Sequence, residues 1–268
     1  MDMYQFNQIP SEAQIKKCLK HIIFGVNLYC PRCKSAKIYA SQERYRCRKC
    51  RTRFSLLSHT WLANLKLPLN QFWMTLWCWT TQIPVKQAQS LTKLSEVSVR
   101  HWYEEFRHHL PQEQEVLDHL VQLDEAYFGG KSGRALLLGK QVGSRKLAYQ
   151  LLPHTNVCRE HAWWFVQTYI RPQTQLNTDG ASIYNKIEDW WPVYHYRDIH
   201  KKWEFTNTSE IEGAFGNLRT FIRRMYHHVT VAKLEEMTME FCFRFTHPEI
   251  FENPRYYLEK SLFIVPTR

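Results

Sequence analysis

Hydrophobic positions in the first 110 residues recur at helical spacing. Between 69 and 80, apolar side chains fall three or four residues apart, which predicts an amphipathic helix whose aromatic residues form core. Pro84 then interrupts the pattern, and two further helices are predicted at 85–93 and 96–110, joined by a short turn. This arrangement suits a helix-turn-helix. The second of its helices carries Arg100, His101, Arg107 and His108 on faces that we expect to be exposed.

From about residue 119 the pattern changes to strands that alternate with helices. Three strands in meander spacing precede the first helix of this region, and single strands and helices then alternate to the end of the pattern. The expected strands cover 119–130, 135–143, 146–155, 174–180 and 192–200, and the expected helices cover 160–170, 181–190 and 209–225. This order is that of a ribonuclease-H-like fold, which is a mixed sheet flanked by helices in the α+β or mixed α/β class.

The charge of the chain is concentrated at its front. The net charge is +11, and residues 1–67 hold 13 Lys and Arg against 3 Asp and Glu, whereas the remaining residues are almost balanced. A basic segment of this kind favours a polyanionic partner. No apolar run approaches the roughly 18–20 residues of a membrane span, and the start lacks the layout of a signal peptide. We therefore expect a soluble intracellular protein.

Four of the eight cysteines form two close pairs inside this basic segment. Cys30 and Cys33 form one C-x₂-C pair, and Cys47 and Cys50 form the other after 13 intervening residues. Two such pairs supply the four thiolates of a tetrahedral Zn²⁺ site, and a metal stabilises a block too small for a core of its own. The spacing therefore predicts a structural zinc ribbon. Its basic residues alternate with aromatic ones, which favours contact with a phosphate backbone over reading of base sequence.

Two aspartates occur at the ends of strands predicted in the second region. Asp124 ends the apolar part of the first strand, and Asp179 follows the fourth strand. A carboxylate in such a place is unfavourable unless a cation or hydrogen-bond donors satisfy it. Two of them on neighbouring strands would bind Mg²⁺ and leave positions for phosphate and water. The alternative is that each is an aspartate that forms a turn.

A third carboxylate is offered by the last long helix. Glu212 lies 33 positions after Asp179, in the first turn of that helix and at the edge of its apolar face. The motif Ser209-x-x-Glu212 is equally a capping box, in which the glutamate only holds the start of the helix. The other candidates for a third ligand are Glu210, Asn207 and His200.

In this order the motifs resemble the bacterial insertion-sequence transposases that have an N-terminal zinc ribbon and a DDE-type catalytic domain. CLKHIIFGVNLYCPRC is similar to the start of their ribbon, LDEAYFGGK to the first catalytic block and NTDGASIY to the second. NTSEIEGAFGNLRTFIRRMYHHVT, followed by MEFCFRF, is similar to the third. The resemblance covers nearly the whole chain. Phe215 stands where the family usually has tryptophan, and the stretch from Asn207 to Glu212 carries an extra residue.

The resemblance implies an enzyme that cleaves DNA and transfers its 3′-hydroxyl end into target DNA. It assigns Asp124, Asp179 and Glu212 as catalytic ligands of Mg²⁺, for which Mn²⁺ would substitute. Some relatives have asparagine or histidine as the third ligand. The ribbon and the helix-turn-helix would bind double-stranded DNA at terminal inverted repeats, and the protein would act as a homodimer or larger assembly. We assign DNA contacts to Lys34, Lys37, Arg44, Arg46, Arg48, Lys49, Arg51, Arg53, Arg100, Arg107, Lys131, Arg219 and Arg223.

These expectations divide the chain into three domains. They are a zinc-ribbon domain with an N-terminal helix (1–58), a helical helix-turn-helix domain that binds DNA (59–115) and the ribonuclease-H-like catalytic domain (116–268). We expect a cytoplasmic, nucleoid-associated protein in a bacterium. The competing interpretations are a transposase-derived zinc-ribbon regulator that binds DNA without catalysis, and a metal-dependent nuclease of the same fold. An intact set of three carboxylates argues against the regulator, and the DNA-binding front end argues against a general nuclease.

Overall fold

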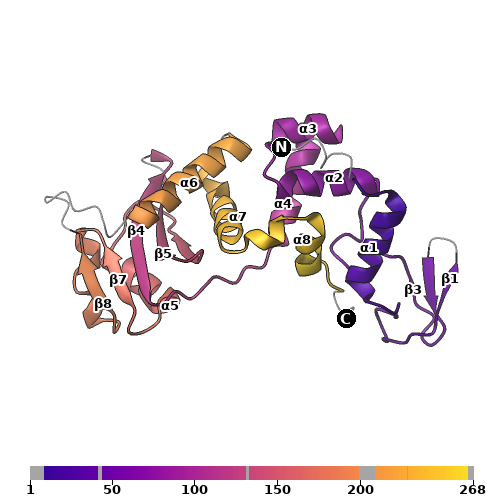
Figure 1. The fold of residues 1–268 in the computed structure, drawn as a ribbon, viewed down its shortest axis with the longest axis horizontal. Helices are drawn as coiled ribbons and strands as arrows, with labels where there is room; N and C mark the ends of the chain where they lie inside the picture. The colour runs from indigo at the N-terminus through magenta and orange to yellow at the C-terminus, as the bar shows by residue number, and fades with distance from the viewer. Residues whose placement is uncertain (1–8, 42–43, 131–132, 199–208, 228, 265–268) are drawn as a thin grey trace. The chain divides into compact units, whose positions relative to one another are not determined.

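A computed structural model describes residues 9–41, 44–130, 133–198, 209–227 and 229–264. The chain forms two compact units, of which the first contains residues 1–111 and 249–268 and the second contains residues 112–248 (Figure 1). No helix in the described ranges is long and apolar enough to cross a membrane.

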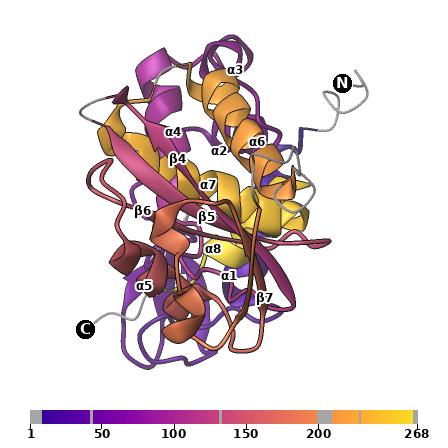
Figure 2. The same ribbon diagram turned by 90° about the vertical axis from the view of Figure 1, so that its left-hand side faces the viewer.

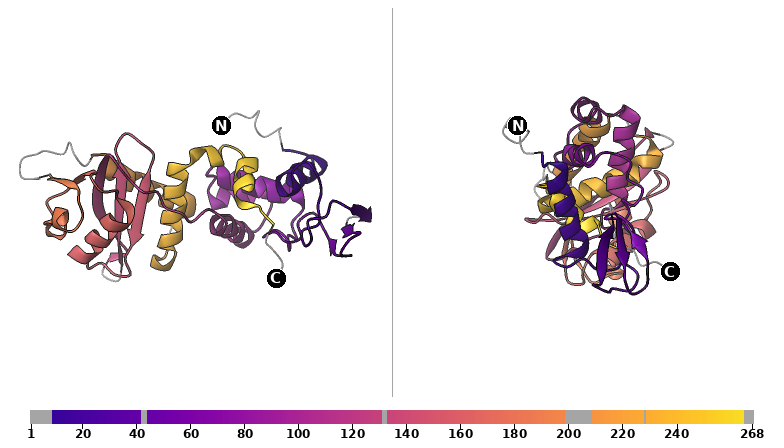
Figure 3. Two further views of the ribbon diagram at one scale, coloured as in Figure 1. Left: turned by 90° about the horizontal axis from the view of Figure 1, so that it is seen from below. Right: turned by 90° about the vertical axis from the view of Figure 1, so that its right-hand side faces the viewer.

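The first unit begins with helix α1 and a small antiparallel sheet of order β1-β2-β3. Ser11 caps α1 in a capping box with Gln14, which explains why the helix begins at Glu12. The right-hand view of Figure 3 shows α1 beside the strands of this sheet. The bounds are α1 Glu12–Phe24, β1 Ile38–Ser41, β2 Arg44–Cys47 and β3 Arg53–Phe54.

Four helices complete the first unit: α2 (Leu69–Thr80), α3 (Val85–Thr92), α4 (Glu96–His108) and α8 (Pro254–Ser261). The helices predicted at 69–80, 85–93 and 96–110 are therefore confirmed. Lys93 ends α3 in the left-handed conformation, and Ser95 caps α4 by accepting a hydrogen bond from the Ser98 amide.

The aromatic residues of α2 form core, as predicted. The ring of Trp79 lies 5.5 Å from that of Phe106 in α4 and 5.1 Å from that of Tyr257 in α8. The Tyr257 hydroxyl also donates a 2.8 Å hydrogen bond to the Phe106 carbonyl. The C-terminal helix α8 thus packs within the first unit, whereas the sequence analysis assigned all residues from 116 to 268 to one catalytic domain.

The second unit is built on a five-stranded sheet of order β6-β5-β4-β7-β8. Strands β6, β5 and β4 pair antiparallel, whereas β4, β7 and β8 run parallel. This is the mixed sheet of the ribonuclease-H-like fold, so the predicted fold class is confirmed. The bounds are β4 Leu120–Phe128, β5 Arg134–Gln141, β6 Leu147–Leu151, β7 Gln175–Thr178 and β8 Tyr194–Arg197.

Helices α5 (Arg159–Tyr169) and α6 (Ser209–Tyr226) cover opposite faces of this sheet (Figure 2). Side chains alternate between the faces along β4. Val121 and Leu123 pack in the core under α5, together with Phe165. Gln122 points to the other face, where its Oε1 accepts a 2.9 Å hydrogen bond from the Ile211 amide at the start of α6. Helix α7 (Leu234–Thr246) follows α6 and packs against it.

One predicted helix is wrong. Residues 181–190 form two short 3₁₀ turns, η3 (Ser182–Tyr184) and η4 (Ile187–Asp189), in place of one α-helix. Lys186, between them, has φ 60° and ψ 34°, and this left-handed conformation interrupts helical hydrogen bonding. The break lets both Tyr184 and Ile187 face the core under α5.

Candidate functional site

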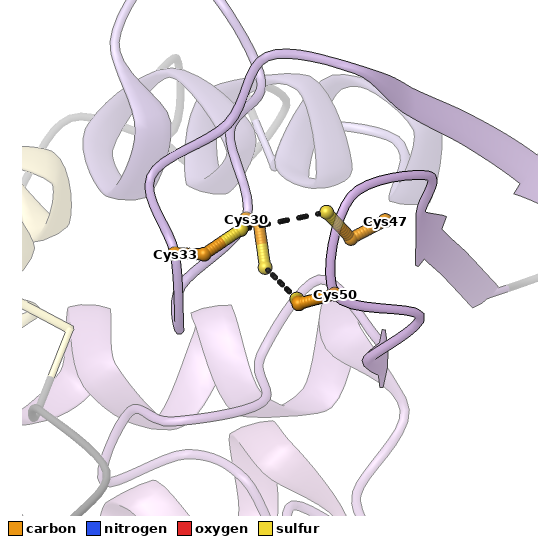
Figure 4. A group of neighbouring side chains, drawn as sticks. All are labelled: Cys30, Cys33, Cys47 and Cys50. Carbon is orange, nitrogen blue, oxygen red and sulfur yellow. Dashed lines mark hydrogen bonds between the residues drawn. The ribbon is translucent and has the colours of Figure 1, made fainter.

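The four paired cysteines converge on one point, as Figure 4 shows. The Sγ atoms of Cys30 and Cys50 are 3.5 Å apart, those of Cys33 and Cys47 are 3.6 Å apart, and all four lie within 4.8 Å of one another. A tetrahedral Zn²⁺ with Zn–S bonds of about 2.3 Å requires sulfurs about 3.8 Å apart. The donor set and its spacing therefore fit a structural zinc ion.

Each cysteine pair lies in a turn of the same form. Lys34 donates its amide to the Cys30 carbonyl and Arg51 donates its amide to the Cys47 carbonyl, and both residues have left-handed φ values near 60°. Hydrogen bonding with Thr52 lowers the pKa of Cys50 to about 6, and the backbone amide of Cys50 lowers the pKa of Cys47. Both effects favour the thiolate forms that bind zinc.

Basic side chains surround a concavity of about 770 Å³ beside the first cysteine pair. Its cationic lining is Lys34, Lys37, Arg48 and Lys49. Aromatic rings support two of these cations: the Lys34 ammonium lies 4.9 Å from the Tyr29 ring centre, and the Arg48 guanidinium lies 5.8 Å from that of Tyr39. Of the other ribbon residues assigned to DNA contact, Arg44, Arg51 and Arg53 are exposed and Arg46 is half-buried.

The predicted contact residues on α4 differ in their exposure. Arg100 is exposed and bonded to Glu96, with its Nη2 2.7 Å from the carboxylate. Arg107 is only 2% exposed, so its predicted position on an exposed face is wrong. The sequence pattern of α4 placed Arg107 on a polar face, and its burial depends on contacts that this pattern does not contain.

Asp124 and Asp179 meet where the parallel pairing of β4 and β7 ends. Leu123 pairs with Thr178, so these aspartates occupy the next position on each strand. Strand β4 continues to Phe128 beside β5, within the strand predicted at 119–130, so Asp124 lies inside the strand and not at its end. Asp124 accepts a hydrogen bond from the Glu125 amide, and Asp179 accepts one from the Ala181 amide.

Glu125 joins the two aspartates, so the cluster contains a carboxylate that the sequence analysis treated only as part of the surrounding signature. Oxygen atoms of Asp124, Glu125 and Asp179 lie within 4.8 Å of one another. Strand alternation predicts that Glu125 points to the opposite face from Asp124. The buried Tyr184 hydroxyl donates a 2.5 Å hydrogen bond to the Glu125 carboxylate. Only the fold of η3 places that hydroxyl there.

Electrostatics distinguish this cluster from ordinary surface carboxylates. Burial raises the pKa of Asp124 to about 7, and the charges of Glu125, Asp179 and Glu212 contribute to the increase. Burial also raises the pKa of Glu125, against the hydrogen bond from Tyr184. Closely spaced carboxylates of this kind are suited to a divalent cation, which removes their mutual repulsion. The donor set therefore fits Mg²⁺, a cation that binds oxygen ligands.

Two candidates for the third ligand, Glu210 and Glu212, lie in the first turn of α6 and have different surroundings. Glu210 is engaged elsewhere: the buried Lys140 ammonium lies 2.9 Å from its Oε2, and the Gly143 amide donates to Oε1 at 3.3 Å. The hydrogen bond from Lys140 lowers the pKa of Glu210. Glu212 is exposed, and its charge acts on Asp124. Asn207 and His200 lie outside the described residues.

Two of the remaining predicted DNA contacts, Arg219 and Arg223, lie on α6. The Arg219 guanidinium lies 5.7 Å from the ring centre of Phe128 and 5.9 Å from that of Phe215. Both Arg219 and Arg223 are exposed. Lys131 lies outside the described residues.

In the comparison with known proteins, the zinc-ribbon segment and the segment with the acidic cluster both match transposase families. Residues 116–246 match the family model described as an ISXO2-like transposase domain, and residues 10–53 match that of a transposase zinc-ribbon domain. A comparison with curated proteins finds no match.

Two retroviral proteins are among the solved structures with a similar fold. The catalytic core domain of BIV integrase aligns over 47% of this chain and 82% of that chain, with 12% identity and a TM-score of 0.36. A chain of the simian T-cell lymphotropic virus intasome in complex with PP2A regulatory subunit B56 gamma aligns over 63% of this chain and 64% of that chain, with 12% identity and a TM-score of 0.35. At TM-scores this low, neither similarity carries weight for function.

Proposed function

Because the chain belongs to the insertion-sequence transposases that have an N-terminal zinc ribbon and a DDE catalytic domain, we propose that Asp124, Asp179 and Glu212 are its catalytic ligands. The enzyme cleaves and joins DNA in a metal-dependent reaction. Its substrates in this proposal are the terminal inverted repeats of its own element and a target duplex. The observation that carries the residue assignment is the junction of β4 and β7, where two aspartates meet and the charge of Glu212 contributes to the raised pKa of Asp124.

In this proposal the residues of the chain orient the substrate and hold the metal ligands in place. Bound Mg²⁺ would polarise the phosphate and lower the pKa of the attacking hydroxyl. Asp124 and Asp179 supply oxygens from adjacent strands, and their backbone hydrogen bonds hold the two carboxylates in position. Tyr184 holds the neighbouring Glu125 carboxylate in the cluster. Two fixed strands and one helix therefore define the site.

The anchoring of α6 supports Glu212 as the third ligand. Gln122 binds the Ile211 amide, and Lys140 binds Glu210, so contacts from the sheet hold the residues immediately before Glu212. Because Glu210 is engaged by this ion pair, Glu212 is the carboxylate of that turn left to face the metal.

DNA binding by the front end is proposed on its charge and shape. The concavity formed by Lys34, Lys37, Arg48 and Lys49 can hold a phosphate group, and its cations are presented by a zinc-stabilised turn. We assign end recognition to this ribbon together with Arg100 of α4. We also propose that the protein acts as a homodimer or larger assembly, because two element ends must be joined, and that it works in the bacterial cytoplasm on nucleoid DNA.

A strand-transfer assay tests this function. The substrates are duplexes from the DNA that flanks the gene, with Mg²⁺ or Mn²⁺, and the variants are Asp124→Asn, Asp179→Asn and Glu212→Gln. Glu160→Gln is the matched control for Glu212, because Glu160 is an exposed glutamate in the first turn of another helix, α5. We expect joined products from wild type and Glu160→Gln, and none from the other three variants, all of which should still bind DNA.

The competing functions correspond to distinct results of the same assay. Wild-type protein that binds the ends without nicking or joining them would be a regulator, and wild-type protein that cuts without joining would be a nuclease. An active Glu212→Gln variant beside an inactive Glu210→Gln variant would move the third ligand to Glu210.

A further inference from the structure

Two tyrosines on the edge strand of the catalytic sheet are exposed. Tyr194 and Tyr196 in β8 are 61% and 56% accessible to solvent. Strand β8 is the last in the sheet order, so one of its edges has no partner among the described strands. Two exposed aromatic side chains close together on one strand form a larger apolar surface than a single side chain does, and such contiguous surfaces are typical of binding sites.

The strand register places both tyrosines on the same face as α6. Tyr196 pairs with Asn177 of β7, which pairs with Gln122 of β4. Side chains of paired residues share a face, and Gln122 points to α6, where it binds the Ile211 amide. Tyr194 lies two residues before Tyr196 and therefore points to the same face.

The proposed metal ligands occupy the next row on this face. Asp124 and Asp179 each lie two residues beyond Gln122 and Asn177. With strands about 4.8 Å apart and a rise of about 6.6 Å for two residues, the Cα atoms of Tyr196 and Asp179 are about 8 Å apart. This separation is comparable with the length of one nucleotide. A DNA strand held at the carboxylates would therefore pass beside Tyr196.

The chemistry of this surface suits bases rather than phosphates. The nearest arginine on the strand, Arg197, points to the other face and donates to the Gly180 carbonyl. A phenol ring can stack on any base, but only where the base is unpaired. We propose that Tyr194 and Tyr196, defined here as the tyrosine surface, stack on unpaired bases of the DNA strand whose end lies at the carboxylate cluster. This inference rests on the proposed function.

Fluorescence of a modified DNA end tests the tyrosine surface. The probe is a duplex from the flank of the gene, with 2-aminopurine at its terminal nucleotide and either paired or unpaired final positions. Ca²⁺ replaces Mg²⁺ to prevent chemistry. Stacking on a tyrosine quenches 2-aminopurine, so the full-length wild-type protein should quench the unpaired probe.

The variants are Tyr194→Ala, Tyr196→Ala and Tyr196→Phe, with Trp164→Ala as the control for loss of an exposed aromatic side chain. Trp164 is 46% exposed and lies on α5, which covers the opposite face. Both tyrosine-to-alanine variants should lose quenching and bind the unpaired end about 5- to 150-fold more weakly. Tyr196→Phe and Trp164→Ala should behave as wild type, and all variants should bind the paired end equally well.

The outcomes separate this inference from the proposed function. Wild-type strand transfer in Mg²⁺ without quenching in Ca²⁺ would overturn the tyrosine surface and leave the transposase function intact. Quenching without strand transfer would support the inference about the tyrosine surface and contradict the proposed transposase function. Alanine variants that quench normally but sediment as smaller assemblies would show that the surface contacts a second copy of the chain, which also overturns the inference.

Discussion

Replacing Asp124 with asparagine should stabilise the protein in the absence of Mg²⁺, although it removes a proposed catalytic ligand. Burial, together with three neighbouring carboxylates, raises the pKa of Asp124 from its ordinary value of 3.8 to about 7. Well below pH 3.8 the carboxyl is protonated in both states. Between pH 4 and 7 the unfolded chain releases this proton more readily than the folded one, so stability falls as the pH rises, and above pH 7 the full loss is present. Asparagine keeps the shape of the side chain and carries no charge.

The magnitude follows from the size of the pKa change. A difference of about 3 units at about 1.36 kcal/mol per unit corresponds to a destabilisation of about 4 kcal/mol at pH 8. Solvent screening of the partly exposed side chain reduces this value, and we expect Asp124→Asn to raise the free energy of unfolding by about 2–4 kcal/mol at pH 8. The gain should fall to about half at pH 5.5.

Differential scanning calorimetry is the assay. The buffer is cleared of free divalent ions on a resin, so that the ribbon retains its zinc, and the transition of the second unit is identified by its shift when Mg²⁺ is added. For a unit of about 140 residues, an unfolding entropy of about 0.3 kcal/mol/K converts the gain into a Tm increase of roughly 7–14 °C. Saturating Mg²⁺ should reduce or reverse the difference, because the wild type gains more binding energy.

Asp189→Asn is the matched control, since Asp189 is exposed and lies outside the cluster. Its Tm should stay within about 2 °C of the wild-type value at both pH values. A Tm for Asp124→Asn at or below the wild-type value, at pH 8 without Mg²⁺, would refute the conclusion that the cluster holds a buried, uncompensated charge.

Three further predictions concern the ribbon and the anchoring of α6. Cys50→Ser should lower the zinc content from one ion per chain, measured by atomic absorption, and abolish DNA binding while the Mg²⁺-sensitive transition of the second unit persists. Lys140→Met should raise the Mg²⁺ concentration required for strand transfer roughly tenfold, because it releases Glu210 and loosens the turn before the third ligand. The zinc content of this variant should not change. Adding Glu210→Gln to it should not restore the wild-type dependence on Mg²⁺. Replacing Lys37 and Arg48 together by glutamine should reduce the slope of log K against log salt by roughly 1.8, measured by fluorescence anisotropy with end DNA, and an unchanged slope would exclude their contact with phosphate.

Much of the arrangement could be predicted from the sequence because it depends on local chemistry. Two C-x₂-C pairs at this spacing can supply the four ligands of one zinc ion, and the four sulfurs converge as predicted. Periodicity identified α2, α3 and α4, since each helix buries one apolar stripe. The order of strands and helices from residue 119 also restricts the topology strongly, and it indicated the mixed sheet on which Asp124 and Asp179 become neighbours.

Contacts between residues far apart in the sequence decided the rest. Arg107 is buried near the end of α4, although the periodicity within α4 placed it on an exposed face. Glu125 lies in the acidic cluster, where the hydroxyl of Tyr184, about 60 residues later in the chain, donates a hydrogen bond to its carboxylate. The sequence left both Glu210 and Glu212 as candidates in the first turn of α6, but Lys140 from β5 binds the first, and the charge of the second acts on Asp124. Periodicity and spacing determine which residues share a strand or a helix face, whereas the pairing of a charge with its partner depends on where distant elements pack.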